Sequence, residues 1–253
     1  MSVRKLLLAV ISLGGCAIAA PIGFLGIGSS GVVNATLTSI QFTPDVSAVG
    51  VCPGAPCNGD VNTGTTLTFF GGPLLPGEGI LINGGFAFGT PPPAGATFYN
   101  PFLQFAAHSN LIFTFLGVDA GSANTNCAGL ASGQSCSIAE GVAVSPVVLT
   151  RTGTNTNVSI SIFGTATDGT SSSYWTGGFS ATIPNTTPLE IAQYFCGADA
   201  FCSDAEIANS PNLVVRSTSG SFFATTVPEP NTTVLLGAGL ILLSLTLRRV
   251  KVM

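Results

Sequence analysis

The chain has 253 residues, enough for one domain or two small ones. Only 7% of the residues are charged and 46% are hydrophobic, which excludes an intrinsically disordered chain, because disorder requires high charge and low hydrophobicity. Between residues 36 and 226, two arginines stand against ten acidic residues, a net charge of −8. A nucleic-acid-binding protein is therefore excluded, since such proteins need a basic surface.

The N-terminus has the pattern of an export signal. Arg4 and Lys5 precede a long apolar run, as in the positive and hydrophobic parts of a signal peptide. Small residues that suit a signal peptidase occur at Ala17-Ile18-Ala19 and at Val33-Asn34-Ala35. We prefer cleavage after Ala35, because Pro21 closely follows the first site. A lipidated Cys16 in the stretch "LGGC" and an uncleaved membrane anchor are the alternatives.

Six of the seven cysteines form three tight local pairs. The spacings C-x4-C, C-x8-C and C-x5-C differ from the C-x2-C knuckles of zinc sites and favour disulfides in an oxidising compartment. Buried free thiols are the alternative. The predicted pairs are Cys52 with Cys57, Cys127 with Cys136, and Cys196 with Cys202.

Short runs rich in Phe, Val, Ile and Thr alternate with turn residues through the middle of the chain. They predict strands at 36–43, 65–70, 80–88, 96–105, 111–118, 147–151, 157–166, 174–183, 212–217 and 221–226. Many short strands with one helix predict an all-β ectodomain over residues 36–226, folded as a β-sandwich or a jelly-roll-like domain.

One hairpin and one helix are the clearest local predictions. In "NVSISIFGTAT" apolar residues alternate with serines, "TDGTSSS" supplies a turn at Asp168-Gly169, and "YWTGGFSATI" returns as the second strand. In "TTPLEIAQYFCG", Thr187 and Glu190 form a capping box, Pro188 occupies the first turn and Gly197 ends the helix.

His108 is the only histidine, and no G-x-S-x-G segment accompanies it. Apolar residues surround it in "FLQFAAHSNLIFTF", so we expect a structural role. We predict that its ring lies more than about 5 Å from every Asp and Glu carboxylate oxygen, beyond the reach needed for general acid–base catalysis. A glycosidase pair of carboxylates is not excluded, but the sequence singles out no pair.

Two further groups are candidates for ligand binding. Asp199, Asp204 and Glu206 form the densest acidic cluster, which could bind Ca²⁺, although their spacing matches no EF-hand and a solvated acidic face is the favoured interpretation. Tyr174 and Trp175 could stack on sugars. Adjacent strand residues point to opposite faces, so we expect at least one of the two rings to pack in the core.

The C-terminal tail combines three features in a fixed order. Pro228-Glu229-Pro230 precedes a run that is apolar from Thr232 to Leu247, and Arg248, Arg249 and Lys251 follow. Sixteen helical residues span about 24 Å, slightly less than a bilayer core of about 30 Å, and snorkelling arginines could extend the span. We predict a transmembrane helix with its basic end in the cytoplasm.

This tail resembles the PEP-CTERM sorting signal of bacterial exported proteins. The matching positions are Pro228, Glu229, Pro230, the run 234–247, Arg248 and Arg249, so the resemblance covers about the last 26 residues. It implies recognition by a membrane-embedded exosortase that processes the tail near the Pro-Glu-Pro, in bacteria that make exopolysaccharide or biofilm. A plain C-terminal anchor is the alternative.

These observations divide the chain into a signal peptide (1–35), an ectodomain (36–226) and a sorting tail (227–253). We expect an exported, non-enzymatic structural or interaction protein without a cofactor, anchored in the membrane before sorting and then located at the cell surface or outside the cell. Exosortase is the expected partner, and exopolysaccharide a further one. A carbohydrate-binding module is the second interpretation, and a secreted glycan hydrolase the third.

Overall fold

The regular secondary structure of the described chain is almost entirely antiparallel strand. The computed structural model describes residues 20–29, 32–37, 39–43, 51–53, 55–83, 85–87, 99–140, 143–198, 200–203, 205–206, 209–215 and 218–226. The export-signal residues before 20 and the whole sorting tail lie outside these ranges. The strands are β1 (Gly23–Ser29), β2 (Val32–Ala35), β3 (Ser39–Thr43), β4 (Val51–Cys52), β5 (Ala55–Pro56), β6 (Gly59–Val61), β7 (Gly79–Ile82), β8 (Gly85–Ala87), β9 (Tyr99–Phe105), β10 (Ile112–Val118), β11 (Ser135–Glu140), β12 (Ala143–Thr152), β13 (Asn155–Thr167), β14 (Ser172–Ile183), β15 (Leu213–Val215) and β16 (Thr218–Thr226), and the described helix is α2 (Pro188–Cys196).

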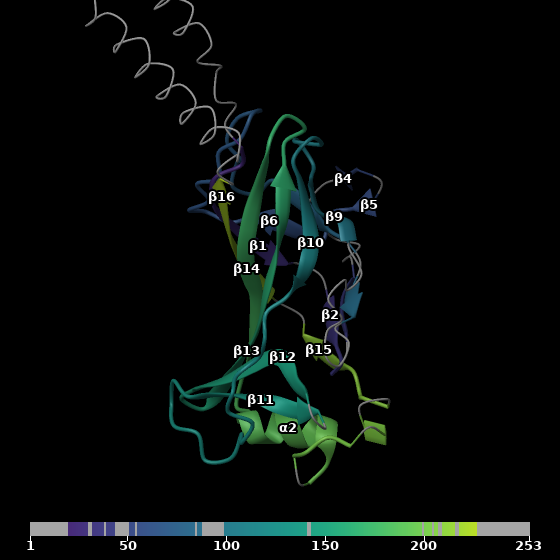
Figure 1. Ribbon diagram of the computed structural model, residues 1–253, viewed down its shortest axis with the longest axis vertical. Coiled ribbons are helices and arrows are strands. Elements are labelled where there is room, and N and C mark those ends of the chain that lie inside the picture. Colours follow the sequence, from purple (N-terminus) through teal and green to yellow (C-terminus); the bar gives the residue numbers. More distant parts are fainter. Residues whose placement is uncertain are drawn as a thin grey trace, which may run out of the picture.

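The main sheet closes into an eight-stranded barrel, so the predicted sandwich or jelly-roll fold is wrong. The strand order is β10-β9-β7-β6-β1-β16-β14-β13, and β13 pairs back with β10 (Figure 1). Closure is possible because β13 is long enough for two partners on one edge. Its first half pairs with β12, from Thr152↔Asn155 to Val147↔Ile160, and its second half pairs with β10, from Val118↔Ile162 to Ile112↔Thr167. A closed barrel leaves no unpaired edge among its strands.

The hairpin of β13 and β14 forms the longest wall of the barrel, and its prediction is confirmed. The two strands pair continuously from Thr156↔Ile183 to Thr167↔Ser172. Ile160 and Ile162 are buried while Ser161 between them is exposed, as the alternation in the sequence requires. Gly169 has a φ of +86° in the turn, a value that glycine adopts at no steric cost.

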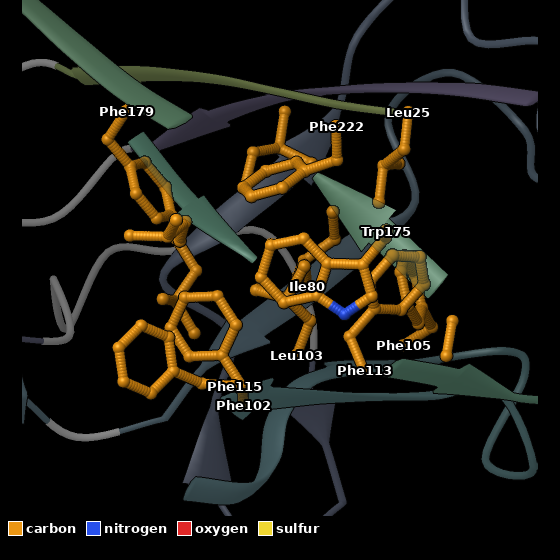
Figure 2. Close-up of a cluster of buried hydrophobic side chains, with 14 of the residues drawn as sticks. Leu25, Ile80, Phe102, Leu103, Phe105, Phe113, Phe115, Trp175, Phe179 and Phe222 are labelled. Atoms are coloured by element: carbon orange, nitrogen blue, oxygen red, sulfur yellow. The ribbon is translucent and has the colours of Figure 1, made fainter. Parts of the chain in front are cut away.

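Aromatic side chains fill the barrel (Figure 2). Trp175 is only 1% exposed, and its ring centroid lies 5.3 Å from that of Phe222, 5.8 Å from Phe113 and 6.0 Å from Phe102. Its indole N–H donates a hydrogen bond to the carbonyl oxygen of Thr165 at 3.0 Å. Gly164 is opposite Trp175 in the register, and a Cβ at Gly164 would lie 2.6 Å from the indole ring. The interior is therefore a packed core and not a channel.

A second, four-stranded sheet of order β15-β2-β3-β8 packs against the lower part of the barrel. Val33, Ile40 and Phe42 join the barrel core, and the Phe42 ring lies 4.8 Å from that of Phe179 on β14. A small apolar cavity of about 50 Å³ remains between this sheet and β12 to β14, lined by residues such as Val147 and Val158.

Helix α2 closes the end of the molecule below this sheet, and its predicted cap is confirmed. The Thr187 hydroxyl accepts from the Glu190 N–H at 3.3 Å, while the Glu190 carboxylate accepts from the Thr187 N–H at 2.7 Å. Pro188 begins the helix and Gly197 caps its end. The buried face of α2 packs in a second core cluster with Leu37, Leu149 and two of the disulfides.

The first barrel strand lies within the segment that the sequence assigns to the export signal. In β1, Leu25 and Ile27 are fully buried, and the strand pairs with β6 on one side and β16 on the other. Cleavage after Ala35 would remove both β1 and β2 from the mature protein. The other predicted site, Ala17-Ile18-Ala19, leaves both strands in place.

Candidate functional site

His108 lies beside a carboxylate, so the prediction of a distance above about 5 Å is wrong. Its Nε2 is 3.6 Å from Oε2 of Glu78, whose side chain is 6% exposed. The two meet because β7 pairs with β9: the loop that enters β7 carries Glu78, and the loop that leaves β9 carries His108. The sequence did not predict this contact, because a long stretch of chain separates the two residues.

The surroundings of this pair are those of a structural contact. Oε1 of Glu78 accepts a hydrogen bond from the Ala107 N–H at 3.1 Å, and the His108 ring meets the Phe69 ring edge-on at 5.0 Å. Within the described residues, the His108 ring makes no hydrogen bond to a serine or threonine hydroxyl, the group that a nucleophilic hydrolase would need. The pair joins two loops at one end of the barrel.

Asp168 is the most strongly engaged acidic group in the described chain, and sequence reasoning used it only as a turn residue. Its side chain is almost fully buried. Oδ1 accepts hydrogen bonds from the N–H and hydroxyl groups of Thr170 and Ser171, at 2.6 to 3.3 Å, and Oδ2 accepts one from the Phe70 N–H at 2.9 Å. The carboxylate thereby ties the β13–β14 turn to a loop 98 positions away.

These contacts lower the pKa of the Asp168 carboxyl and keep it ionised. Burial alone raises the pKa of this carboxyl, but hydrogen bonds from the Thr170 hydroxyl and from the backbone N–H groups of Phe70, Thr170 and Ser171 outweigh it and lower the pKa to about 2. The carboxylate is therefore charged at neutral pH, and both of its oxygens accept hydrogen bonds from the chain itself.

We expect Asp168→Ala to remove a pH-dependent part of the stability. A pKa depressed from 3.8 to about 2 contributes about 2 kcal/mol, present above pH 4 and lost as the pH falls to about 2. Urea unfolding of wild type and variant from pH 6 downward measures the difference. The gap between the two free energies of unfolding should narrow by about that amount on acidification. A gap that stays constant would contradict the assignment.

The predicted acidic cluster is only partly described. Asp199 and Asp204 lie outside the described residues, so the cluster itself stays a prediction. The carboxylate of Glu206 accepts from the N–H and hydroxyl of Ser203 at 2.8 and 2.7 Å, and these hydrogen bonds lower the pKa of Glu206. The part of the chain that is described contains no group of three or more His, Cys, Asp or Glu residues that could hold a metal ion.

The three predicted disulfides are confirmed, each within its own local pair. Cα atoms are 5.1 Å apart for Cys52–Cys57, 5.3 Å for Cys127–Cys136 and 4.4 Å for Cys196–Cys202. All six cysteines are buried. In the chain-entropy model each short loop adds roughly 2–3 kcal/mol to stability. Disulfides of this kind persist in an oxidising compartment outside the cytoplasm, which agrees with export.

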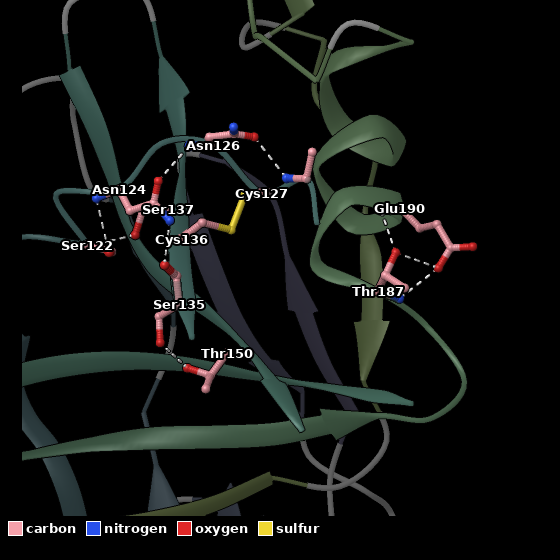
Figure 3. The surroundings of a disulfide bond; sticks show 11 residues. Ser122, Asn124, Asn126, Cys127, Ser135, Cys136, Ser137, Thr150, Thr187 and Glu190 are labelled. Atoms are coloured by element: carbon pink, nitrogen blue, oxygen red, sulfur yellow. Dashed lines mark hydrogen bonds between the residues drawn. A yellow bond between two sulfur atoms is a disulfide. The ribbon is translucent and has the colours of Figure 1, made fainter. Parts of the chain in front are cut away.

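Figure 3 shows how the Cys127–Cys136 disulfide closes a loop held by neutral polar side chains. The Ser137 hydroxyl accepts from the Ser122 N–H at 2.7 Å, and the Asn124 amide donates to the Ser135 carbonyl at 3.0 Å. Asn126 accepts from the Ala128 N–H at 2.9 Å. Neutral side chains therefore hold this loop, and its disulfide packs in the same core cluster as the buried face of α2.

Of the two adjacent aromatic residues, Trp175 packs in the barrel core and Tyr174 is 54% exposed on the outside. The prediction that at least one ring is buried is confirmed. Trp175 is therefore removed from the candidates for sugar stacking.

An open polar groove lies on the outer wall of the barrel, and sequence reasoning missed it. It crosses β1, β14 and β16 and is lined by Gly28, Asn62, Ser180, Ala181, Thr182, Thr218 and Ser219, with a volume of about 450 Å³. The Ser180 and Ser219 hydroxyls lie 3.2 Å apart. Thr218 is 8% exposed and its hydroxyl is buried, so this hydroxyl is not open to a ligand in the groove. The exposed hydroxyl groups of the lining, such as those of Thr182 and Ser219, can hydrogen-bond to sugar hydroxyls.

Comparison with known proteins identifies no relative. No protein-family model matches the chain, and no curated protein or solved structure is significantly similar to it. In the described part of the chain, no helix has both the length and the apolar character needed to cross a bilayer.

Proposed function

We propose that this protein is an exported, non-catalytic structural or interaction protein of the bacterial cell surface or matrix, sorted through its C-terminal tail by an exosortase. The observation that carries the proposal is the amino-acid sequence of the tail, in which Pro228-Glu229-Pro230, an apolar run and Arg248-Arg249 follow one another. Three disulfides in a domain directly before that tail support delivery to an oxidising compartment. In this proposal, the tail contains the sorting signal and a membrane segment, and the barrel is the domain that is exported.

A rigid scaffold suits this role better than an enzyme does. The barrel interior is filled with aromatic rings, and the buried carboxylates Glu78 and Asp168 are engaged by backbone N–H groups. Among the described residues, neither is directed at an open cavity with a nucleophile or a second carboxylate, the arrangement that hydrolysis requires.

Replacement of Pro228-Glu229-Pro230 by three alanines tests the sorting proposal. In a host with an exosortase, we expect the variant to stay in the inner membrane, whereas the wild type reaches the surface. Fractionation followed by immunodetection measures the distribution. The matched control replaces the next three residues, Asn231-Thr232-Thr233, by alanines and keeps the Pro-Glu-Pro, so it should be delivered normally. Surface delivery of the Pro-Glu-Pro variant at the wild-type level would contradict the sorting proposal.

Carbohydrate binding is the second candidate, and the polar groove favours it. The groove offers hydroxyl and amide groups without a charged residue in its lining. Exopolysaccharide is the partner of matching chemistry in bacteria with such sorting tails. Co-sedimentation of the ectodomain with that polysaccharide, lost in Ser219→Trp and kept in Ser221→Trp on the same exposed face of β16, would favour this function over a purely structural one.

A further inference from the structure

Both ends of the described chain leave the barrel at the same end. Gly23 at the start of β1 pairs with Ala224, and Thr226 at the end of β16 pairs with Ser173 beside the β13–β14 turn. The loop that contains Phe70 and the loop that contains His108 lie at this end too. We call it the exit end. Helix α2 lies at the opposite end of the molecule (Figure 1).

The exit end exposes a group of large apolar side chains, which we call the exit patch: Ile22 (38% exposed), Phe70 (65%), Leu75 (65%), Tyr174 (54%) and Phe223 (56%). These are half of the ten large hydrophobic residues that are exposed in the described chain. Phe223 is opposite Phe24 in the register, and their ring centroids are 5.0 Å apart. Apolar groups concentrated in this way indicate contact with another surface.

The acidic residues nearest the exit patch in the described chain are engaged or partly buried, although the whole chain has a net charge of −4. Glu78 faces His108 and the Ala107 N–H, and Asp168 is buried and accepts hydrogen bonds through both oxygens. Asp60, which is half-buried, lies opposite Gly79 in the register and therefore next to Glu78. Exposed acids such as Asp119 and Glu190 lie farther down the molecule. This end is therefore the part of an acidic protein that an anionic lipid surface would repel least.

The sequence outside the described residues places apolar segments next to the exit patch. After Thr226, only residues 227–233 precede the apolar run 234–247, and seven residues reach about 25 Å at most when fully extended. Before Ala20, the chain is apolar from Leu6 onward apart from Ser12. The twelve residues of β14 span about 40 Å. A membrane segment at 234–247 would hold the exit end close to the bilayer, and not the α2 end.

We propose that, in the form that still carries its apolar tail, the exit patch rests on the lipid bilayer, with Tyr174 and Phe223 in the headgroup region. Tyrosine favours this region because its ring can be buried while its hydroxyl stays hydrated, and the phenyl ring of Phe223 is stabilised by leaving water. The inference rests on the membrane segment of the proposed function and adds an orientation: α2 and the polar groove point away from the membrane.

The test uses the full chain with its tail, reconstituted into phosphatidylcholine vesicles with or without bromine on the acyl chains. Phe223→Trp places a fluorophore in the exit patch, and Tyr194→Trp, 50% exposed on α2, is the matched control. Trp175 is buried in both variants and gives a common background. We expect brominated lipid to quench the tryptophan introduced by Phe223→Trp and to leave that introduced by Tyr194→Trp unaffected.

Flotation of the vesicles separates the two claims. Protein that floats but shows equal quenching, or none, at the two positions contradicts the bilayer contact and leaves the anchor intact. In a third outcome, brominated lipid does not quench the Phe223→Trp variant, but its emission wavelength shifts with protein concentration. A second copy of the chain then covers the patch, which also overturns the inference. Protein that fails to float refutes the membrane segment of the proposed function and the bilayer contact with it.

Discussion

A chain that begins at Thr36 should fail to fold, whereas a chain that begins at Ala20 should fold. The shorter chain lacks β1, which joins β6 to β16 and closes the barrel. It also lacks β2, which joins β15 to β3 in the second sheet. Loss of β1 removes two fully buried side chains and leaves two strand edges unpaired, a defect comparable with the whole stability of a domain, about 5–15 kcal/mol.

Thermal unfolding of both chains, each ending at Thr226 and produced in an oxidising compartment, measures this difference. We expect a cooperative transition and a near-ultraviolet circular dichroism signal from Trp175 only in the longer chain. A cooperative transition in the chain that begins at Thr36 would mean that β1 is dispensable, and cleavage after Ala35 would then be compatible with the barrel.

Trp175→Ala should be the most destabilising single substitution in the barrel. The indole is packed among Phe102, Phe113 and Phe222, and its removal leaves a cavity and deletes the hydrogen bond from the indole N–H to the Thr165 carbonyl. Substitutions of this kind cost about 3–5 kcal/mol. The adjacent Tyr174→Ala is the matched control, because Tyr174 is exposed on the other face of β14 and should lose about 0.5 kcal/mol or less.

Chemical denaturation of the ectodomain from Ala20 to Thr226 gives both free energies of unfolding. Equal losses for the two variants would show that Trp175 does not occupy the centre of the core. A loss confined to Trp175→Ala would confirm that the barrel interior is a packed aromatic core.

Local features of the fold were predictable because their signals lie close together in the sequence. The β13–β14 hairpin follows from alternation on both sides of a turn, and α2 follows from Thr187, Pro188 and Glu190 within four positions. The three disulfides follow from short cysteine spacings. Each of these depends on residues that are neighbours before folding begins.

Barrel closure was not predictable, because it depends on pairing between distant segments. Ile112 pairs with Thr167, and the sequence of β13 does not show that its two halves have different partners. The expected strand at 65–70 is described as a single bridge, Ile22↔Thr68, although this segment runs along β1 through backbone hydrogen bonds. β11 was missed because "SCSIAE" has little apolar alternation.

Strand β1 was not predicted, for a different reason. "GFLGIGS" continues the apolar run of the leader, and a buried strand and a signal-peptide core are both short continuous apolar runs. The candidate site shows the same limit. Contact between His108 and Glu78 depends on two loops that meet only after β7 pairs with β9, and the polar groove depends on three strands that become neighbours only in the folded sheet.

Intact-mass and terminal-peptide mass spectrometry of the protein recovered from the cell surface is the most direct test of an exported, tail-sorted barrel. We predict a mature chain that begins at Ala20, so that β1 is retained, that ends near Pro228-Glu229-Pro230 and that contains three local disulfides. A surface protein that keeps residues 234–253, or that begins at Thr36, would contradict the account.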